Sequence, residues 1–325
     1  MKIIQETTEF GLDMLRGLPI AYWHVLNKEP HKCIVKPGLK ALYHLITPHV
    51  EETDKFHPSN PSSLYSHSRP KWTVNNWTPP PLKTIFEERS HGIDYILPNF
   101  NKPTVVINNK FSACWDEIKT RKAAKELNVS TSMDEILTLP MDLESHATAA
   151  RYGQKSSYNG IKEVSLFHYS LPMLRKIIDL LSDKYQIIYI RPIEASKGYF
   201  TDHNLTFNPG DYELLENEYP DVYTIKEFMD NNKHIDFTIA QFILESMSTK
   251  HLSTLGGNCK VSAYFGGDVI MYQNRIWKEG HPKGNRGIFN TGSWLQLLSN
   301  ANIVSLTTYE SILEYIKNKW ITDEN

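Results

Sequence analysis

Apolar and polar positions in residues 1–107 form a pattern that predicts short strands around one helix. Strands are predicted at residues 2–5, 33–35 and 104–107, where brief apolar runs are bounded by polar residues. Apolar positions at helical spacing predict a helix over 12–26. Between these elements, residues 52–82 are rich in Pro, Ser, His and Trp, and three consecutive prolines forbid a helix or a central strand, so we expect a long loop.

The rest of the chain alternates helices and strands. Leu174, Ile177 and Leu181 follow helical spacing and lead into the apolar run 186–190, which predicts a helix and then a buried strand. Further helices are predicted at 115–127, 133–139, 239–247, 256–265, 294–298 and 309–316, and further strands at 251–254, 269–272 and 303–306. Such alternation is typical of parallel sheets covered on both faces. We therefore expect an α/β protein with two Rossmann-like domains facing a cleft.

A polar stretch with Gly and Ser at 147–160 suits a connection between domains. It predicts an N-terminal domain at 1–160, which carries the Pro-rich loop 52–82, and a C-terminal domain at 161–325.

Composition excludes several classes of protein. The 325 residues are 40% hydrophobic and 22% charged, which is typical of a globular chain and not of a disordered or fibrous one. Lys and Arg number 35 against 37 Asp and Glu, a net charge of -2, so no overall basic field attracts nucleic acid or an anionic membrane. We expect no nucleic-acid partner.

The cysteines and the apolar runs indicate a cytoplasmic location. Cys33, Cys114 and Cys259 lie far apart and form no CxxC pair, which favours a reducing compartment. Charged residues interrupt the first thirty positions, and no apolar run approaches about 18 residues, so we expect neither an export signal nor a membrane span.

The turn after the predicted strand 251–254 is the first candidate ligand site. Gly256 and Gly257 end the strand where the next helix begins, and Asn258 can cap that helix. Amide N–H groups at a helix start suit a diphosphate or a ribose, and glycine lets a ligand approach the backbone. The alternative is a tight turn whose glycines serve only the backbone conformation.

Arg191 is the second candidate. It directly follows the apolar strand 186–190, and a guanidinium there can clamp phosphate oxygens in a bidentate manner. The polar loop behind it contains Asp202. The alternative is a solvated loop with a structural Arg–Asp pair.

Motifs for other chemistries are absent. The sequence contains no Asp-x-Asp, no His/Cys/Asp cluster at metal-ligand spacing, no GxxxxGK[ST] and no GxSxG. The missing phosphate-loop motif argues against sulfuryl transfer. We expect metal-independent chemistry without a cofactor.

The order of several motifs resembles a group of GT-B-type polysaccharide glycosyltransferases over residues 108–306. The motifs are Tyr-Ile-Arg-Pro at 189–192, the loop with Asp202, the segment 219–225, the helix with Gln241, Ser-Thr-Leu-Gly-Gly-Asn at 253–258 and Tyr-Phe-Gly-Gly at 264–267. Val-Val-Ile-Asn-Asn-Lys at 105–110, with Trp115, is similar to an Asn-Lys-Tyr/Phe plus Trp signature of that group. More distantly, Arg191 is similar to the HxRRxD arginine of GDP-fucose-dependent fucosyltransferases.

This resemblance implies a GT-B-like fold and a metal-independent glycosyltransferase that moves a sugar from a nucleoside-diphosphate donor to a glycan or glycoconjugate acceptor. Donor-binding residues would be Arg191, Asp202, Gln241, Gly256, Gly257 and Asn258. Acceptor-binding residues would be Trp72, Trp77, Asn109 and Lys110, although the two tryptophans can instead pack into the first domain. The catalytic base would be Glu9, Asp13 or Asp116. A nucleotide- or glycan-binding protein without turnover is the alternative.

Overall fold

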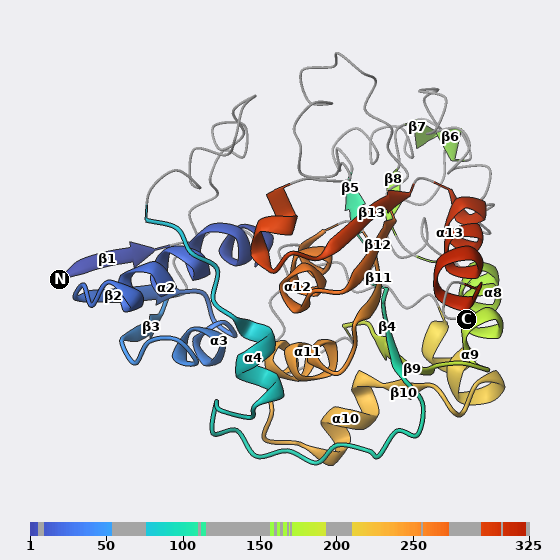
Figure 1. Cartoon of the computed structure of the whole chain (residues 1–325), viewed down its shortest axis with the longest axis horizontal. Helices are drawn as coiled ribbons and strands as arrows, with labels where there is room; N and C mark the ends of the chain where they lie inside the picture. The colour runs from blue at the N-terminus through green and yellow to red at the C-terminus, as the bar shows by residue number, and fades with distance from the viewer. Residues whose placement is uncertain are drawn as a thin grey trace.

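Two parallel β-sheets and the helices around them make up the computed structural model of the chain (Figure 1). The structure describes residues 1–5, 10–53, 76–109, 112–114, 157–158, 161–162, 165–167, 169, 171–192, 210–254, 256–272, 294–306 and 308–322. The predicted α/β class with parallel sheets is confirmed.

The smaller sheet has three parallel strands in the order β1-β2-β3. These are β1 (Lys2–Gln5), β2 (His31–Val35) and β3 (Val50–Glu52). The predicted helix 12–26 is confirmed as one helical segment in three parts, α1 (Phe10–Leu12), η1 (Asp13–Gly17) and α2 (Leu18–Leu26). The middle part is a π-helix, a form that is rare and frequent at functional sites. A short helix α3 (Lys40–His44) precedes β3.

The larger sheet has six strands in the order β10-β9-β4-β11-β12-β13. Their bounds are β4 (Thr104–Asn108), β9 (Gln186–Ile190), β10 (Tyr223–Thr224), β11 (Lys250–Thr254), β12 (Asp268–Tyr272) and β13 (Asn302–Leu306). All neighbouring pairs are parallel. Numbered along the chain, the strands have the order 3-2-1-4-5-6 of doubly wound nucleotide-binding folds.

The division between the sheets differs from the predicted boundary near residue 160. Strand β4, assigned to the first domain from sequence, lies in the middle of the six-stranded sheet and pairs with both β9 and β11. The sheets therefore divide before Thr104. A buried parallel strand is apolar throughout, so its sequence does not show which sheet it joins.

Helices cover both faces of the six-stranded sheet (Figure 1). One face packs with α4 (Leu82–Glu87), α10 (Ile225–Asn231), α11 (Phe237–Ser246), α12 (Gly257–Phe265) and η4 (Trp294–Leu298). The other packs with α8 (Leu171–Leu181), α9 (Asp211–Glu218), α13 (Tyr309–Tyr315) and η5 (Ile316–Thr322). Val106 belongs to the first apolar cluster and Val105 and Ile107 to the second, as strand alternation requires.

The first of these clusters also contains the buried side chains of the small sheet and its helix, among them Ile4, Met14 and Leu18. The small sheet is thus joined to the large one through α11 and α12. Every residue of α11 is buried.

Short antiparallel pairs complete the described elements. Strands β5 (Ser112–Cys114) and β8 (Ser165–Phe167) form one pair, and β6 (Ser157–Tyr158) and β7 (Ile161–Lys162) the other. The predicted helices at 115–127 and 133–139 lie outside the described residues.

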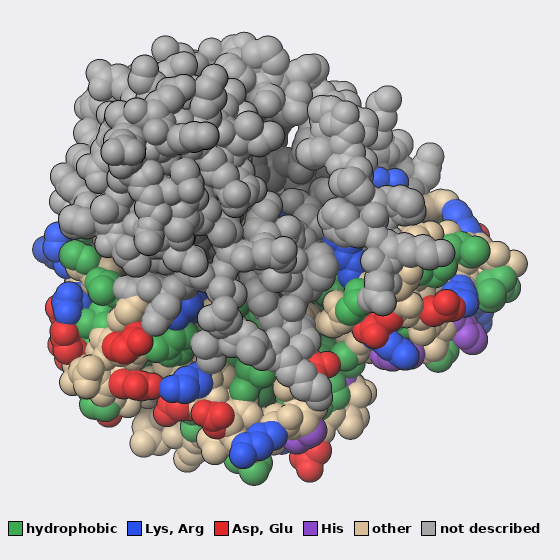
Figure 2. All heavy atoms as spheres, turned by 180° about the vertical axis from the view of Figure 1, so that it is seen from behind, with side chains coloured by type: hydrophobic (Ala, Val, Ile, Leu, Met, Phe, Trp, Pro, Cys, Tyr) green, Lys and Arg blue, Asp and Glu red, His purple; other side chains and the backbone are tan. Residues whose placement is uncertain are grey.

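The described surface carries both signs of charge. Figure 2 shows described acidic and basic side chains interspersed along the lower part of the face turned away from the viewer of Figure 1. Among the helices of the described ranges, none combines the length and the apolar character needed to cross a bilayer.

A buried histidine, His24, lies in the last turn of α2. His24 Nδ1 lies 2.8 Å from Glu29 Oε2, and the His24 ring lies 5.6 Å from that of His31. Burial lowers the pKa of His24, and the charge of nearby Lys2 lowers it further, while Glu29 acts in the opposite direction.

We expect acidification to destabilise the fold through His24. His24 binds a proton less tightly in the folded chain than in the unfolded chain, so keeping it neutral stabilises the fold. This contribution is complete above the ordinary histidine pKa of 6.5, and it is lost as the pH falls through the lowered pKa of His24. Urea unfolding at pH 7.5 and 5.5 measures the loss. In His24→Gln the difference between the two pH values should shrink, and an unchanged difference would contradict the assignment.

Candidate functional site

The order of the strands reverses between β4 and β11. Strands β9 and β10 extend the sheet on one side of β4, and β11 to β13 extend it on the other. Sheets of this order bind ligands beyond the carboxyl ends of the strands at the reversal. The residues at this position are Asn108, which ends β4, Asn109 directly after it, Gly256, which is the N-cap of α12, and Gly257 and Asn258 in the first turn of α12.

The two glycines of this turn have different reasons to be glycine. Gly256 has φ 145° and ψ -154°, a conformation that other residues rarely adopt, and a Cβ there would have no heavy atom of the described residues within 4 Å. A Cβ on Gly257 would lie 2.8 Å from Phe10 Cδ1. Gly256 therefore turns the backbone beside open space, whereas Gly257 lets α1 pack closely on α12.

Asn258 is not the cap of α12, and that prediction is wrong. Gly256 occupies the N-cap position, and Asn258 lies inside the first turn. Its Nδ2 instead donates to Asn108 Oδ1 at 2.6 Å. The amide therefore links the end of β4 to the start of α12.

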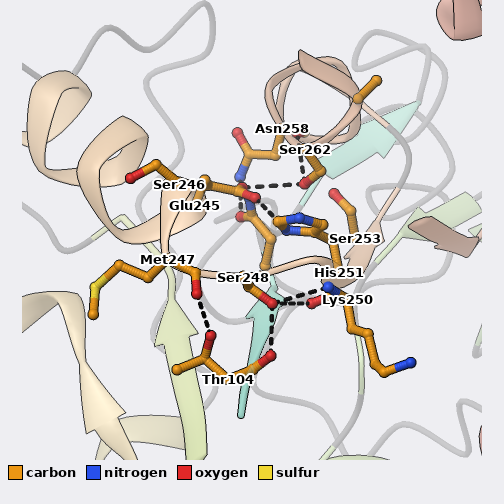
Figure 3. Close-up of polar contacts among 12 residues, drawn as sticks. Thr104, Glu245, Ser246, Met247, Ser248, Lys250, His251, Ser253, Asn258 and Ser262 are labelled. Atoms are coloured by element: carbon orange, nitrogen blue, oxygen red, sulfur yellow. Dashed lines mark hydrogen bonds and ion pairs between the residues drawn. The ribbon is translucent and has the colours of Figure 1, made fainter. Parts of the chain in front are cut away.

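Glu245 of α11 is the centre of a buried polar network beneath this turn (Figure 3). Its Oε1 accepts hydrogen bonds from Asn108 Nδ2 at 2.7 Å and from Ser262 Oγ at 3.1 Å. His251 Nδ1 of β11 lies 2.8 Å from Oε2. The network therefore joins β4, β11, α11 and α12 where the strand order reverses.

Arg191 lies at the carboxyl end of β9 in a second buried cluster. Its Nε is 2.5 Å from Asp211 Oδ2, its Nη1 donates to Pro192 O at 3.1 Å, and its guanidinium carbon lies 4.7 Å from the centre of the Tyr212 ring. Tyr189 also donates to Asp211. Burial, with the charge of Asp211, raises the pKa of Tyr189, which keeps its phenol protonated as a donor. The alternative from sequence was an Arg–Asp pair in a solvated loop, and the structure contains instead a buried pair of Arg191 with Asp211.

Asn109 belongs to the Arg191 cluster. Its Nδ2 donates to Tyr189 Oη at 3.0 Å and to Tyr169 O at 3.1 Å, and its Oδ1 accepts from Tyr169 N at 2.6 Å. The predicted acceptor residue Asn109 is therefore on the six-stranded sheet, beside residues assigned to the donor. It holds the chain before α8 against the ends of β4 and β9.

Asp13 lies in the π-helical turn η1 and is fully buried. Its Oδ1 accepts from Tyr43 Oη at 3.0 Å. Burial, together with the charge of Asp13, raises the pKa of Cys33 to about 12, so this thiol is no nucleophile at neutral pH.

Helix α12 packs along the segment that contains Asp13. Phe10 faces Gly257, and the Lys260 ammonium lies so close to Gly11 that a Cβ there would be within 2.2 Å of Nζ. Further along, Tyr264 Oη donates to Met14 O at 2.5 Å. The packing places the candidate base Asp13 next to the helix that begins at the candidate donor site.

Several predicted residues are not placed. Glu9, Trp72, Lys110, Asp116 and Asp202 lie outside the described residues. Gln241 is buried in α11, one turn before Glu245, and its Nε2 has no hydrogen-bond partner in the described part of the chain. Within the same part, no three His, Cys, Asp or Glu side chains group as metal ligands.

No protein-family model and no curated protein sequence matches the chain. Among solved structures, it is similar to the ADP-heptose LPS heptosyltransferase II of E. coli, with 10% sequence identity, a TM-score of 0.43 and complete coverage of both chains.

The buried polar residues of the site that were not predicted from sequence include Asn108, Asp211 and Glu245. Asn108 is adjacent to a predicted residue. Glu245 has a visible signal, because a carboxylate inside the otherwise apolar run 239–247 must have partners if that helix is buried. The capping box of Thr224 and Glu227 likewise marks the start of α10, which was not predicted.

We expect Trp77→Phe to lower the free energy of unfolding by about 1 kcal/mol, the usual net contribution of a hydrogen bond. Trp77 Nε1 donates to Leu15 O at 2.7 Å, and the half-buried ring packs on the first apolar cluster. Urea unfolding measures the change. Unchanged stability with a raised acceptor KM would instead support the acceptor-binding role.

Proposed function

We propose that the protein is a glycosyltransferase that moves a sugar from a nucleoside-diphosphate donor to a glycan or glycoconjugate acceptor. The observation that carries the proposal is the glycine turn and helix start of α12 at the strand reversal of a 3-2-1-4-5-6 sheet. The motif order of residues 108–306 adds the glycosyl-transfer chemistry.

The donor diphosphate would lie on the amide N–H groups at the start of α12, next to the open space at Gly256. Its negative charge grows as the glycosidic bond breaks, and these fixed amides would stabilise it without a metal ion. Arg191 would act from the end of β9, which β4 separates from β11, with Asp211 fixing the orientation of its guanidinium. Asp202 and Gln241 remain further candidates for the donor.

The acceptor would bind on the side of the small sheet. Asp13 is the candidate base that the structure describes, and Glu9 and Asp116 remain candidates from sequence. Trp72, Trp77, Asn109 and Lys110 remain acceptor-binding candidates. Asn109 donates to Tyr189 in the Arg191 cluster, so it would lie where the acceptor approaches the donor. The buried free thiols Cys33 and Cys259 support a role in the reducing cytoplasm.

A panel of ADP-, UDP-, GDP-, dTDP- and CMP-sugars, measured by calorimetry with and without EDTA, tests the proposal. We expect one nucleotide class to bind equally well in both conditions and to release nucleoside diphosphate slowly without acceptor. A large loss of nucleotide affinity when EDTA is added would contradict the metal-free mechanism. Tight binding without any release would favour the nucleotide-binding alternative.

Two glycines at opposite ends of α12 provide a matched control. Gly256 and Gly266 both have positive φ, so alanine strains the backbone at either position, and among the described residues no atom would lie closer than 3.7 Å to the added Cβ. We expect Gly256→Ala to weaken nucleotide binding at least 10-fold and Gly266→Ala to leave it unchanged. If both variants change nucleotide binding equally, the nucleotide does not bind at the start of α12.

A further inference from the structure

The network around Glu245 has a fixed hydrogen-bond direction. Glu245 Oε1 accepts hydrogen bonds from Asn108 Nδ2 at 2.7 Å and from Ser262 Oγ at 3.1 Å, and only the NH2 group of an asparagine side chain can donate. Asn108 must therefore turn its NH2 group toward Glu245. Its carbonyl oxygen then faces Asn258, 2.6 Å away, and Asn258 must in turn direct its own NH2 group inward.

This direction determines what Asn258 offers to a ligand. With its NH2 group held by Asn108, the side chain presents its carbonyl oxygen on the opposite side, as Figure 3 shows. The residue is 3% exposed, yet Oδ1 accepts no hydrogen bond from any described residue and is not sealed from solvent. A nearly buried acceptor thus lies unused in the first turn of α12, two residues after the open space at Gly256.

A carbonyl oxygen in that position accepts from hydroxyl or N–H groups and repels phosphate oxygens. The amide N–H groups of the same turn have the opposite preference. The turn therefore contains two adjacent subsites, one for an anion and one for a hydrogen-bond donor. The sequence suggested a diphosphate or a ribose for this turn, and the Asn258 oxygen suits a hydroxyl and not a phosphate oxygen.

We propose that Asn258 Oδ1 accepts a hydrogen bond from a sugar hydroxyl of the nucleotide donor, and that Glu245 is the positioning residue that makes Asn258 an acceptor. The inference rests on the proposed function. The hydroxyl can belong to the ribose or to the transferred sugar, and both supply the same donor group.

The first test compares hydroxyl and deoxy ligands. UDP, GDP and ADP, each with its 2′-deoxy and 3′-deoxy forms, report on the ribose, and UDP-glucose and GDP-mannose with their monodeoxy forms report on the transferred sugar. In the unaltered protein, one deoxy position should weaken binding about 3- to 10-fold, the range of one net hydrogen bond. In Asn258→Ala, the hydroxyl ligand should lose that advantage while the corresponding deoxy ligand binds as before.

The second test separates positioning from stability. Glu245→Gln places an amide that can donate to Asn108, so the direction of the hydrogen bonds from residue 245 through Asn108 to Asn258 is no longer fixed. The ratio of the affinities for the hydroxyl and the deoxy ligand should then fall toward 1. Ser262→Ala removes another hydrogen bond to Glu245 without altering that direction. We expect it to lower the melting temperature but to keep the selectivity.

The outcomes distinguish this inference from the function on which it rests. If Asn258→Ala weakens hydroxyl and deoxy ligands equally, or Glu245→Gln keeps the selectivity, the inference is overturned while nucleotide binding stands. If the unaltered protein binds none of these nucleotides, the proposed function fails and the inference fails with it.

Discussion

Asp211→Ala is expected to lower the free energy of unfolding by about 3 to 5 kcal/mol, the usual cost of removing one partner from a buried ion pair. Asp211 is fully buried and accepts hydrogen bonds from Arg191 Nε, Tyr189 Oη and Tyr212 N. Alanine at this position leaves the buried guanidinium without its carboxylate. Urea unfolding followed by circular dichroism measures the loss.

Removing the other partner of the pair, in Arg191→Ala, should lower the free energy of unfolding by less. In Arg191→Ala, the carboxylate of Asp211 keeps its hydrogen bonds from Tyr189 and Tyr212. Sequence alone predicts that Arg191→Ala lowers turnover far more than stability, whereas the buried pair predicts that both fall. The double variant Arg191→Met/Asp211→Leu completes the comparison, and it should be more stable than Asp211→Ala alone because no charge stays buried. If Asp211→Ala is as stable as the unaltered protein, Arg191 and Asp211 do not form a buried ion pair that stabilises the fold.

Gly267→Ala is expected to destabilise the fold by about 3 kcal/mol, since it combines two costs. Gly267 has φ +69°, which strains any other residue, and a Cβ there would lie 2.0 Å from the backbone oxygen of Thr249. Backbone on both sides must shift, and these segments lead into the paired strands β11 and β12. Thermal and urea unfolding both report the change.

Gly266→Ala is the matched control for this prediction. Its φ of +77° gives a similar backbone strain, but the nearest atom to a Cβ would be Ser299 O at 3.7 Å, an ordinary contact. We expect a loss of about 1 kcal/mol. The difference in unfolding free energy between Gly267→Ala and Gly266→Ala measures the clash with Thr249. Equal losses in the two variants would contradict the close approach of Gly267 to Thr249.

Strands and helices were predicted well where the apolar pattern was unambiguous. The predicted strands 2–5, 186–190 and 251–254 correspond to β1, β9 and β11, and the predicted helix 239–247 to α11. Local sequence determines these elements because each buries a continuous apolar stripe or run. The partners of β4 could not be predicted, since pairing depends on which elements meet in space.

The candidate site was predicted only in part, for the same reason. The glycine turn and Arg191 were located because both directly follow apolar strands. Asp211, the partner of Arg191, is 20 positions further along the chain, and Glu245 bonds Asn108 across 137 positions. Neither spacing follows a pattern that predicts the contact. Asn258 shows the limit most clearly, since its residue type suits a helix cap and its actual role depends on Asn108, 150 positions earlier.

The packing of α12 along the first helical segment restricts how this chain can be recombined. Phe10, Gly11 and Met14 meet Gly257, Lys260 and Tyr264 side by side, within an apolar cluster that draws on both sheets. The two sheets are therefore not exchangeable modules. A chimera that takes its small sheet from another protein must also supply a small residue opposite Lys260 and a ring that fits over Gly257, and a fragment starting at Thr104 would uncover the apolar sides of α11 and α12.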